Sequence, residues 1–342
     1  MTLGEGDFPD DIANGLVMAA NNSLANSTWK HYRVILNHVG ECARETGMSE
    51  DFPFDRSQVL TLVGYLLTRK NLKATTVSSY LSALRMQHII RGHLDVTLRS
   101  PLVDMVLSGR ANWDEIQARP TPQRLPMTIK KLELMRAVLE LDRTRDPITK
   151  AAIMAAACLC FWGSFRMGEI LPVRARKVDP ENTLLRKDIS VAEKTVDGRR
   201  MTMLRVKLKS SKESRAYCRG TIIEVFGNGT KTCPVAAFLK YIGLCGNMDQ
   251  DSSAFRTGDG WALRHARMNR ELKMILSPYL SYGSISGHSF RAGIASLMAE
   301  RGMTDEEIRC QGRWSSESFK RYIKLNRVTR VRIAIKLAGI SV

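Results

Sequence analysis

The sequence predicts a mostly α-helical protein with a small antiparallel β-sheet, divided into two domains. Three observations support this prediction. Apolar residues recur every three or four positions over most of the chain, which is the spacing of an amphipathic helix. Two short runs, 201–208 and 221–226, alternate in polarity or are rich in β-branched residues, as strands are. A proline-containing stretch, 111–127, separates two sets of helices, and 342 residues are enough for two hydrophobic cores.

The first domain is expected to be helical throughout. Residues 1–26 are acidic and lack strong helical periodicity, so we expect a flexible tail before it. The domain itself spans 27–110, and its first helix ends at Gly47. Residues that can cap the next two helices are Asp55 or Ser57, and Thr75 or Thr76, and a weaker fourth helix is expected over 101–107.

The linker and the second domain follow. Pro120, Pro122 and Pro126, in a stretch of low apolar content, predict an extended linker over 111–127. The second domain, 128–325, combines the two strands with several helices. We expect these helices at 128–141, 147–162, 234–244, 262–276, 288–301, 304–310 and 316–325, followed by a C-terminal tail at 326–342.

The composition indicates a polyanionic partner. The chain has 52 Lys and Arg residues against 34 Asp and Glu residues, which gives a net charge of +18 and a pI near 9.8. Basic side chains that meet phosphates release condensed counterions, and this release favours binding to nucleic acid. A basic protein without such a partner would have the same charge, so charge alone does not decide the question.

Other classes of protein have little support in the sequence. No basic residue precedes Lys30, whereas an export signal begins with basic residues. The longest apolar run, 151–162, is too short to cross a bilayer and is rich in alanine, so we expect a buried helix and no membrane association. The seven cysteines include no Cys-x-x-Cys pair, and we expect neither a metal site nor a disulfide framework.

Three motifs in the second domain suggest phosphate chemistry. The segment GHSFRAG contains His288 and Arg291, which share one face of a predicted helix because they are three residues apart. The segment GSFRMGE places Arg166 directly after the apolar helix and Glu169 three residues further on. The segment GRWSS precedes Tyr322. Guanidinium groups present fixed forks of donors that match the oxygens of a phosphate.

In their order, these motifs resemble the signature of the tyrosine recombinases, the family of phage integrases and chromosome-dimer resolvases. That signature is an arginine with an acidic residue three positions later, a hairpin lysine, His-x-x-Arg, a histidine or tryptophan, and a C-terminal tyrosine. Each finds a counterpart in this order between Arg166 and Tyr322. The segments SFR, GRWSS and CPVAA narrow the resemblance to recombinases of eukaryotic mobile elements of the DIRS, Ngaro and Crypton kinds.

The resemblance implies an architecture and a first set of roles. The fold would be a C-shaped clamp, with a helical core-binding domain and an α+β catalytic domain that close on DNA. Tyr322 would attack a DNA phosphate, and His288 would accept its proton. Arg166 and Arg291 would stabilise the charge of the pentacovalent transition state.

Further residues would support this chemistry. A hairpin lysine, Lys212 in preference to Lys209, would protonate the departing 5′ oxygen. Trp314 would pack beside the phosphate, and Glu169 would pair with a nearby cation without touching the substrate. Taken singly, each candidate also has an ordinary structural explanation, as a surface arginine, a structural histidine or a core aromatic residue. The ordered set favours the functional interpretation.

Candidate DNA contacts are less specific. They share a basic or hydroxyl side chain on a predicted helix, on the hairpin or beside the tyrosine: Lys30, Arg33, Lys73, Thr75, Ser79, Arg85, Lys209 and Arg313. For any one of them a solvated helix face is an equally good explanation. The apolar residues of the tail, 326–342, are expected either to pack on their own domain or, as the resemblance implies, to dock on a neighbouring subunit.

The predicted function is site-specific DNA recombination through a 3′-phosphotyrosyl intermediate. The resemblance implies double-stranded DNA as substrate, a homo-tetramer on DNA, a nuclear location, and no metal ion, ATP or other cofactor. Two alternatives remain at this point. A type IB topoisomerase uses nearly the same residues to relax supercoils, and a domesticated relative would bind DNA without cutting it. A metal-dependent nuclease lacks a cluster of ligands in the sequence.

Overall fold

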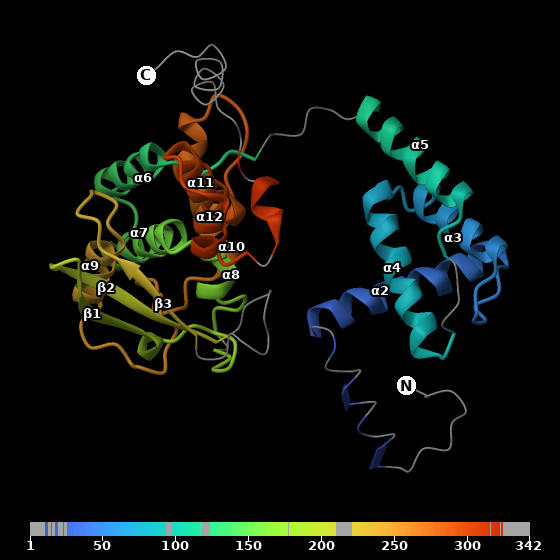
Figure 1. Ribbon diagram of the computed structural model, residues 1–342, viewed down its shortest axis with the longest axis horizontal. Coiled ribbons are helices and arrows are strands. Elements are labelled where there is room, and N and C mark those ends of the chain that lie inside the picture. Colours follow the sequence, from blue (N-terminus) through green and yellow to red (C-terminus); the bar gives the residue numbers. More distant parts are fainter. Residues whose placement is uncertain are drawn as a thin grey trace. The chain divides into compact units, whose positions relative to one another are not determined.

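The chain forms two compact units, Met1–Pro120 and Thr121–Val342. The computed structural model describes residues 26–93, 98–117, 124–176, 178–209, 221–314, 316–321 and 323, together with Asp11, Ile12, Gly15, Met18, Ala19 and Ser23. Both units are mainly helical, and the second also contains a three-stranded antiparallel sheet (Figure 1). The predicted fold class, mostly helical with a small antiparallel sheet, is confirmed.

Four helices make up the described core of the first unit. They are α2 (Asn26–Thr46), α3 (Arg56–Thr68), α4 (Ala74–Ile90) and α5 (Pro101–Gln117). Each contributes apolar side chains to a single buried cluster, which includes Ile35, Leu62, Leu66, Val77, Leu84 and Leu107. This burial, at about 25 cal/mol per Å² of apolar surface, is the main force that holds the four helices together.

The starts of α3 and α4 differ in how well the sequence predicted them. Asp55 caps α3 as expected, because its carboxylate accepts a hydrogen bond from the Gln58 amide and the Gln58 side chain accepts one from the Asp55 amide, both 2.8 Å long. The cap predicted for α4, Thr75 or Thr76, is wrong. The helix begins after Lys73, whose carbonyl already accepts the first helical hydrogen bond.

The predicted linker begins too early in the sequence. Residues 111–117 are not extended, since α5 continues to Gln117. Arg110 binds Asp114 one turn further along the helix (2.7 Å) and donates to the Leu67 carbonyl (2.6 Å). These polar contacts hold a turn of helix that buries little apolar surface, and an apolar pattern therefore does not reveal it. The rest of the predicted linker lies partly outside the described residues.

The second unit is built around α7 (Pro147–Trp162), the predicted apolar helix. α7 contacts α6 (Ile129–Leu141), α9 (Pro234–Cys245) and α11 (Gly287–Glu300), and most of its side chains are buried. The remaining helices are α8 (Met167–Ile170), α10 (His265–Leu276) and α12 (Asp305–Gly312), with 3-10 helices η1 (Arg186–Asp188), η2 (Ser277–Tyr279) and η3 (Glu317–Arg321). In place of the helix predicted over 316–325, the described residues form η3. Within the described part of the chain, no helix combines the length and apolar character needed to cross a membrane.

The sheet has one strand more than expected. β1 (Ile189–Val196), β2 (Arg199–Leu208) and β3 (Thr221–Phe226) pair in that order, and α9 packs against β2 and β3 (Figure 1). β2 and β3 match the two predicted strands. β1 joins β2 through a two-residue turn, Asp197 and Gly198, with φ angles of 48° and 74°. Positive φ at both positions suits the right-handed twist of a hairpin.

Candidate active site

The turn after α7 carries the first predicted arginine. From Gly163 the chain passes through Ser164 and Phe165 to Arg166, which precedes α8. A side chain at Gly163 would lie 2.3 Å from the Phe165 ring, so this turn requires glycine there. The Glu169 carboxylate accepts hydrogen bonds from Arg166 Nη1 and from the Arg166 backbone amide, both at 2.9 Å. One carboxylate therefore fixes both the side chain and the main chain of Arg166.

The second predicted arginine is buried beside this turn. Arg291, on α11, is 1% exposed, and its Nη1 donates to the Ser164 carbonyl at 2.9 Å. Its guanidinium carbon lies 4.5 Å from the ring centroid of Trp314, and Trp314 packs on Phe319 with ring centroids 5.7 Å apart. A carbonyl and an aromatic face together compensate part of the cost of burying a guanidinium. Trp314 is thus both a core residue and a contact of Arg291.

A third arginine joins the same group. Arg313 donates to the Gly163 carbonyl (2.9 Å) and the Ser164 carbonyl (3.3 Å), and forms an ion pair with Glu169 (3.1 Å). The sequence motif suggested only a DNA contact for Arg313. Its position beside Trp314 in the sequence gave no signal that its guanidinium would reach a turn so far away along the chain.

His288 lies at the first turn of α11, one helical turn from Arg291, and its side chain is exposed. At the start of α11, the Ser286 amide donates to Ser289 Oγ at 3.0 Å. A second histidine, His265 on α10, is close to this helix start, since a Cβ at Gly287 would lie 3.4 Å from His265 Nε2. Burial lowers the pKa of His265. His265 belongs to none of the three sequence motifs and was not predicted.

The two remaining predicted participants, Lys212 and Tyr322, lie outside the described residues. Lys209, the second choice for the hairpin lysine, is bound to other residues of the second unit. Its Nζ forms an ion pair with Asp188 (2.9 Å) and donates to the Pro180 carbonyl (2.8 Å). This ion pair ties the end of β2 to η1, so Lys209 has a structural partner of its own.

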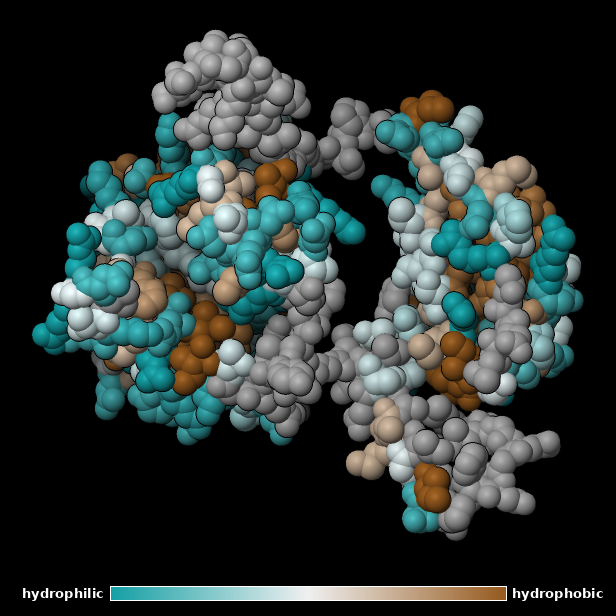
Figure 2. Space-filling view, in the orientation of Figure 1, coloured by the Kyte–Doolittle hydropathy of each residue, from teal (hydrophilic) through white to brown (hydrophobic). Residues whose placement is uncertain are grey.

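The candidate DNA contacts of the first unit all lie on its surface. The side chains of Lys30, Arg33, Lys73, Thr75, Ser79 and Arg85 are exposed on α2, on α4 or at the start of α4. On the side of the molecule drawn in Figure 2, the described surface is mostly hydrophilic. Exposure makes these side chains accessible to a ligand and does not by itself distinguish a DNA contact from a solvated helix face.

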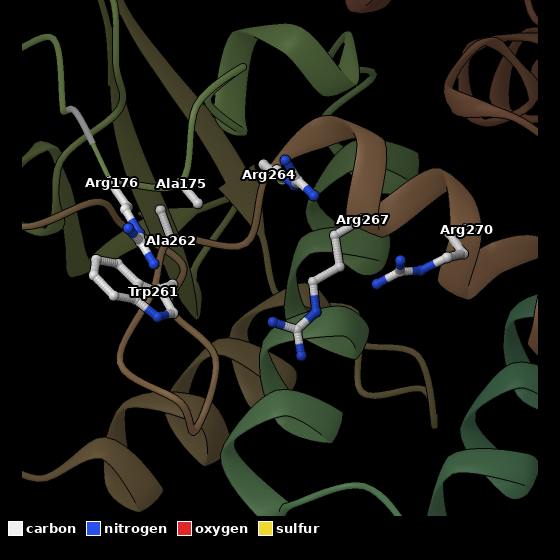
Figure 3. Close-up of a pocket in the computed structure, with 7 residues that line it drawn as sticks. All are labelled: Ala175, Arg176, Trp261, Ala262, Arg264, Arg267 and Arg270. Carbon is white, nitrogen blue, oxygen red and sulfur yellow. The ribbon is translucent and has the colours of Figure 1, made fainter.

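A pocket of about 270 Å³ lies along the start of α10. Arg267 and Arg270 line it from this helix, Arg264 lines it from the position directly before the helix, and Arg176 and Trp261 line it from loops (Figure 3). The guanidinium carbon of Arg176 lies 4.7 Å from the Trp261 ring centroid. The spacing of three residues between the α10 arginines brings them to one side of the helix. This group of arginines was not predicted, although their regular spacing is visible in the sequence.

The pocket concentrates positive charge. Arg267 forms an ion pair with Asp259 at 2.7 Å. Burial alone would raise the pKa of Asp259, but hydrogen bonds from Thr257 and Arg267 outweigh it and lower the pKa to about 2. Among the described residues, Arg264 and Arg270 form no ion pair with an acidic side chain. The pocket can therefore attract an anion such as a phosphate.

The arginine group around Ser164 has the chemistry of an anion site as well. Arg166 and Arg313 bind the Glu169 carboxylate, and Arg291 shares the Ser164 carbonyl with Arg313, so the four charged groups carry a net charge of +2. Within the described ranges, no three His, Cys, Asp or Glu side chains lie together as a metal site would require. The arrangement can stabilise negative charge that develops on a phosphate.

No family model and no curated protein sequence matches the chain. Solved structures match its fold. The XerH site-specific recombinase, bound to a palindromic difH substrate in a post-cleavage complex, matches with a TM-score of 0.56 and 12% identity, over 87% of this chain and 76% of that one. A lambda integrase dimer bound to a COC′ core site matches with a TM-score of 0.53 and 13% identity, over 92% of this chain and 94% of that one. The Tn1549 transposon integrase in complex with transposon right end DNA matches with a TM-score of 0.52 and 12% identity, over 89% of this chain and 99% of that one.

Proposed function

We propose that this chain, which has the fold of the tyrosine recombinases, is a site-specific DNA recombinase that cleaves and rejoins DNA strands through a 3′-phosphotyrosyl intermediate. One observation carries the proposal. Three separate parts of the sequence, represented by Arg166 with Glu169, by Arg291 and by Trp314, form one contiguous group, and His288 lies one turn away on α11. These are the residues that the ordered motifs singled out.

The proposed chemistry balances without an external energy source. The Tyr322 oxygen attacks the phosphorus, the bond from phosphorus to the 5′ oxygen breaks, and the phosphate becomes esterified to the tyrosine. His288 takes the phenolic proton, and Lys212 gives a proton to the departing 5′ oxygen. A 5′-hydroxyl of another strand reverses these steps and rejoins the DNA. One phosphate ester replaces another throughout, so the energy of the bond is conserved.

The arginines suit the transition state of this reaction. The attacked phosphate gains negative charge, and Arg166 and Arg291 bring two fixed guanidiniums to one place. Preorganised donors of this kind act without reorganisation at the moment of reaction. This charge supports a reaction that uses neither a metal ion nor ATP.

The proposal extends to the biological setting. The segments SFR, GRWSS and CPVAA support the recombinase of a eukaryotic mobile element, which would act in the nucleus. Two double-stranded sites contain four strands to be cut, and each cut uses one tyrosine, which supports four protomers on DNA. The lambda integrase match is a dimer bound to a core site, and the Tn1549 match is the integrase of a transposon.

Covalent trapping tests the proposal. DNA that the full chain binds is first selected from a random library, and the selected site is then prepared as a nicked half-site that cannot be rejoined. We expect the wild-type chain to form a covalent protein–DNA adduct, seen as a slower band in a denaturing gel. Tyr322→Phe should bind the same DNA with unchanged affinity and form no adduct, because it lacks only the attacking oxygen.

The other outcomes of this experiment separate the alternatives. Tight binding by the wild-type chain without an adduct on any selected half-site would contradict the proposal and favour a DNA-binding protein that does not cut. An adduct accompanied by relaxation of a supercoiled plasmid, with no recombinant product from paired sites, would favour a topoisomerase.

A further inference from the structure

Two unusual backbone conformations meet at the candidate site. Among the described residues, the non-glycine positions with positive φ angles are Asn71, Ser164, Asp197 and Arg313. Ser164 (φ 52°) and Arg313 (φ 53°) contact each other, since Arg313 Nη2 donates to the Ser164 carbonyl at 3.3 Å. Serine and arginine adopt the left-handed region reluctantly, and such conformations persist where surrounding contacts enforce them. Because both backbone conformations are unfavourable, the contact between Ser164 and Arg313 persists only if the surrounding fold stabilises it.

Arg313 contacts every part of the turn that carries Arg166. Besides Ser164, its guanidinium donates to the Gly163 carbonyl at 2.9 Å, and it lies over the Phe165 ring with a distance of 4.7 Å to the centroid. It also pairs with Glu169 at 3.1 Å. The side chains of Arg313 and Glu169 are 21% and 5% exposed, so water screens this ion pair only weakly.

The shared carboxylate links Arg313 to Arg166. Glu169 Oε2 accepts from both Arg313 and the Arg166 amide, while Oε1 accepts from Arg166 Nη1. With two guanidiniums on one carboxylate, the three groups keep a net charge of +1. Loss of Arg313 would leave an arginine–glutamate pair with no net charge, and would remove one of the contacts that orient the carboxylate.

Arg313 also directs the chain towards the proposed nucleophile. It is the C-terminal cap of α12, and its left-handed conformation turns the chain from that helix into Trp314 and η3. The Trp314 amide donates to the Arg309 carbonyl at 3.0 Å, which closes this cap. η3 ends at Arg321, directly before Tyr322.

We propose that Arg313 is a positioning residue that locks the turn from Gly163 to Arg166 to the segment that leads into Tyr322. It sets the orientation of Arg166 through Glu169 and does not touch the substrate. Its effect on the reaction rests on the proposed function, whereas its effect on the turn does not.

Two substitutions separate the effect of the Arg313 guanidinium from the effect of its left-handed backbone conformation. Arg313→Gly removes the guanidinium at a φ angle that suits glycine, so the chain should keep its fold, as thermal unfolding will verify. Arg313→Lys keeps a cation but cannot bridge two carbonyls and a carboxylate. Arg301→Gly, at the exposed C-terminal cap of α11, is a control that removes the same charge.

The first readout is hydrogen–deuterium exchange of the full chain without DNA. The Arg166 amide, which donates to Glu169, should exchange at least about fivefold faster in Arg313→Gly, less so in Arg313→Lys, and at the wild-type rate in Arg301→Gly. Unchanged exchange at Arg166 in Arg313→Gly would overturn the proposal whether or not the chain cuts DNA.

The second readout is single-turnover cleavage of the selected half-site. Arg313→Gly should lower the rate of adduct formation by about 10- to 100-fold with unchanged DNA affinity, and Arg313→Lys should restore part of the rate. Weaker binding with a smaller dependence on salt, together with unchanged exchange, would mean that Arg313 contacts a DNA phosphate instead. If the wild-type chain forms no adduct, the proposed function is contradicted. The exchange experiment would still decide the role of Arg313.

Discussion

His88 is a buried histidine whose protonation state the fold determines. It is 0% exposed on α4, and its Nε2 accepts a hydrogen bond from the Phe54 amide at 2.9 Å. Nδ1 must therefore carry the proton, which it donates to the Leu84 carbonyl at 2.8 Å. Burial lowers the pKa of His88 below its ordinary 6.5, with smaller contributions from His93 and Arg91. A second proton on this ring would face the Phe54 N–H directly.

We predict that this histidine makes the first unit less stable in acid. Its contribution is fully present above the unfolded pKa near 6.5 and is lost as the pH falls below that value, because the unfolded chain then binds a proton that the folded chain excludes. The urea midpoint for exchange of the α4 amides in the full chain should be lower at pH 5 than at pH 7.5. His88→Gln should reduce this difference, and an equal difference in both proteins would contradict the prediction.

Single residues show which parts of the candidate site the sequence can predict and which it cannot. Arg166, Glu169, His288 and Arg291 could be selected because the order and spacing of their motifs reflect shared chemistry. The contacts of Arg313 could not, because they join it to main-chain carbonyls, which leave no trace in the sequence. The placement of Arg291 over Trp314 is likewise a result of packing between two helices far apart along the chain.

At the scale of helices and strands, prediction succeeds where a buried face and a cap coincide. α7 has both, and the structure gives it the predicted bounds. β1 was missed because nearly all its side chains are at least partly exposed, although the Asp197-Gly198 turn is a strong hairpin signal that could have revealed it. The final turns of α5 were missed for the same physical reason, since they bury little apolar surface.

The packing of α11 depends on one glycine, and we predict a large effect of changing it. A Cβ at Gly293 would lie 1.7 Å from the Met127 carbonyl oxygen, a contact that no side-chain rotation relieves. Gly293→Ala should destabilise the second unit by about 1–3 kcal/mol or more. Gly243→Ala is the matched control in α9, where a Cβ meets nothing within 4 Å, and it should stabilise by up to about 1 kcal/mol. Urea unfolding measures both, and equal midpoints would show that the close approach at Gly293 relaxes without cost.

For the whole molecule, the net charge of +18 favours an interaction with DNA. Each phosphate contact lowers the slope of log K against log salt concentration by about 0.9, so affinity for DNA should fall steeply with salt. A cation that contacts a phosphate affects this slope, whereas one that contributes only to the net charge affects it little.

We predict that the arginine pocket on α10 makes two such contacts. The double variant Arg264→Gln and Arg270→Gln should reduce the size of the salt slope by about 2 and weaken binding to the selected DNA. Arg143→Gln with Arg301→Gln removes two exposed arginines elsewhere and should leave the slope nearly unchanged. Anisotropy titrations at four salt concentrations provide the slopes. Equal reductions in both double variants would show that only net charge matters.

The carbonyl groups that hold Arg291 and Arg313 have an evolutionary consequence. A main-chain carbonyl is common to all residues, so mutation of the side chain at position 164 leaves the acceptor in place. What has to persist there is a backbone shape, a left-handed turn after a glycine without room for a side chain, so position 164 accepts any residue that tolerates this conformation. A site held in this way can keep its geometry while the residue at position 164 changes.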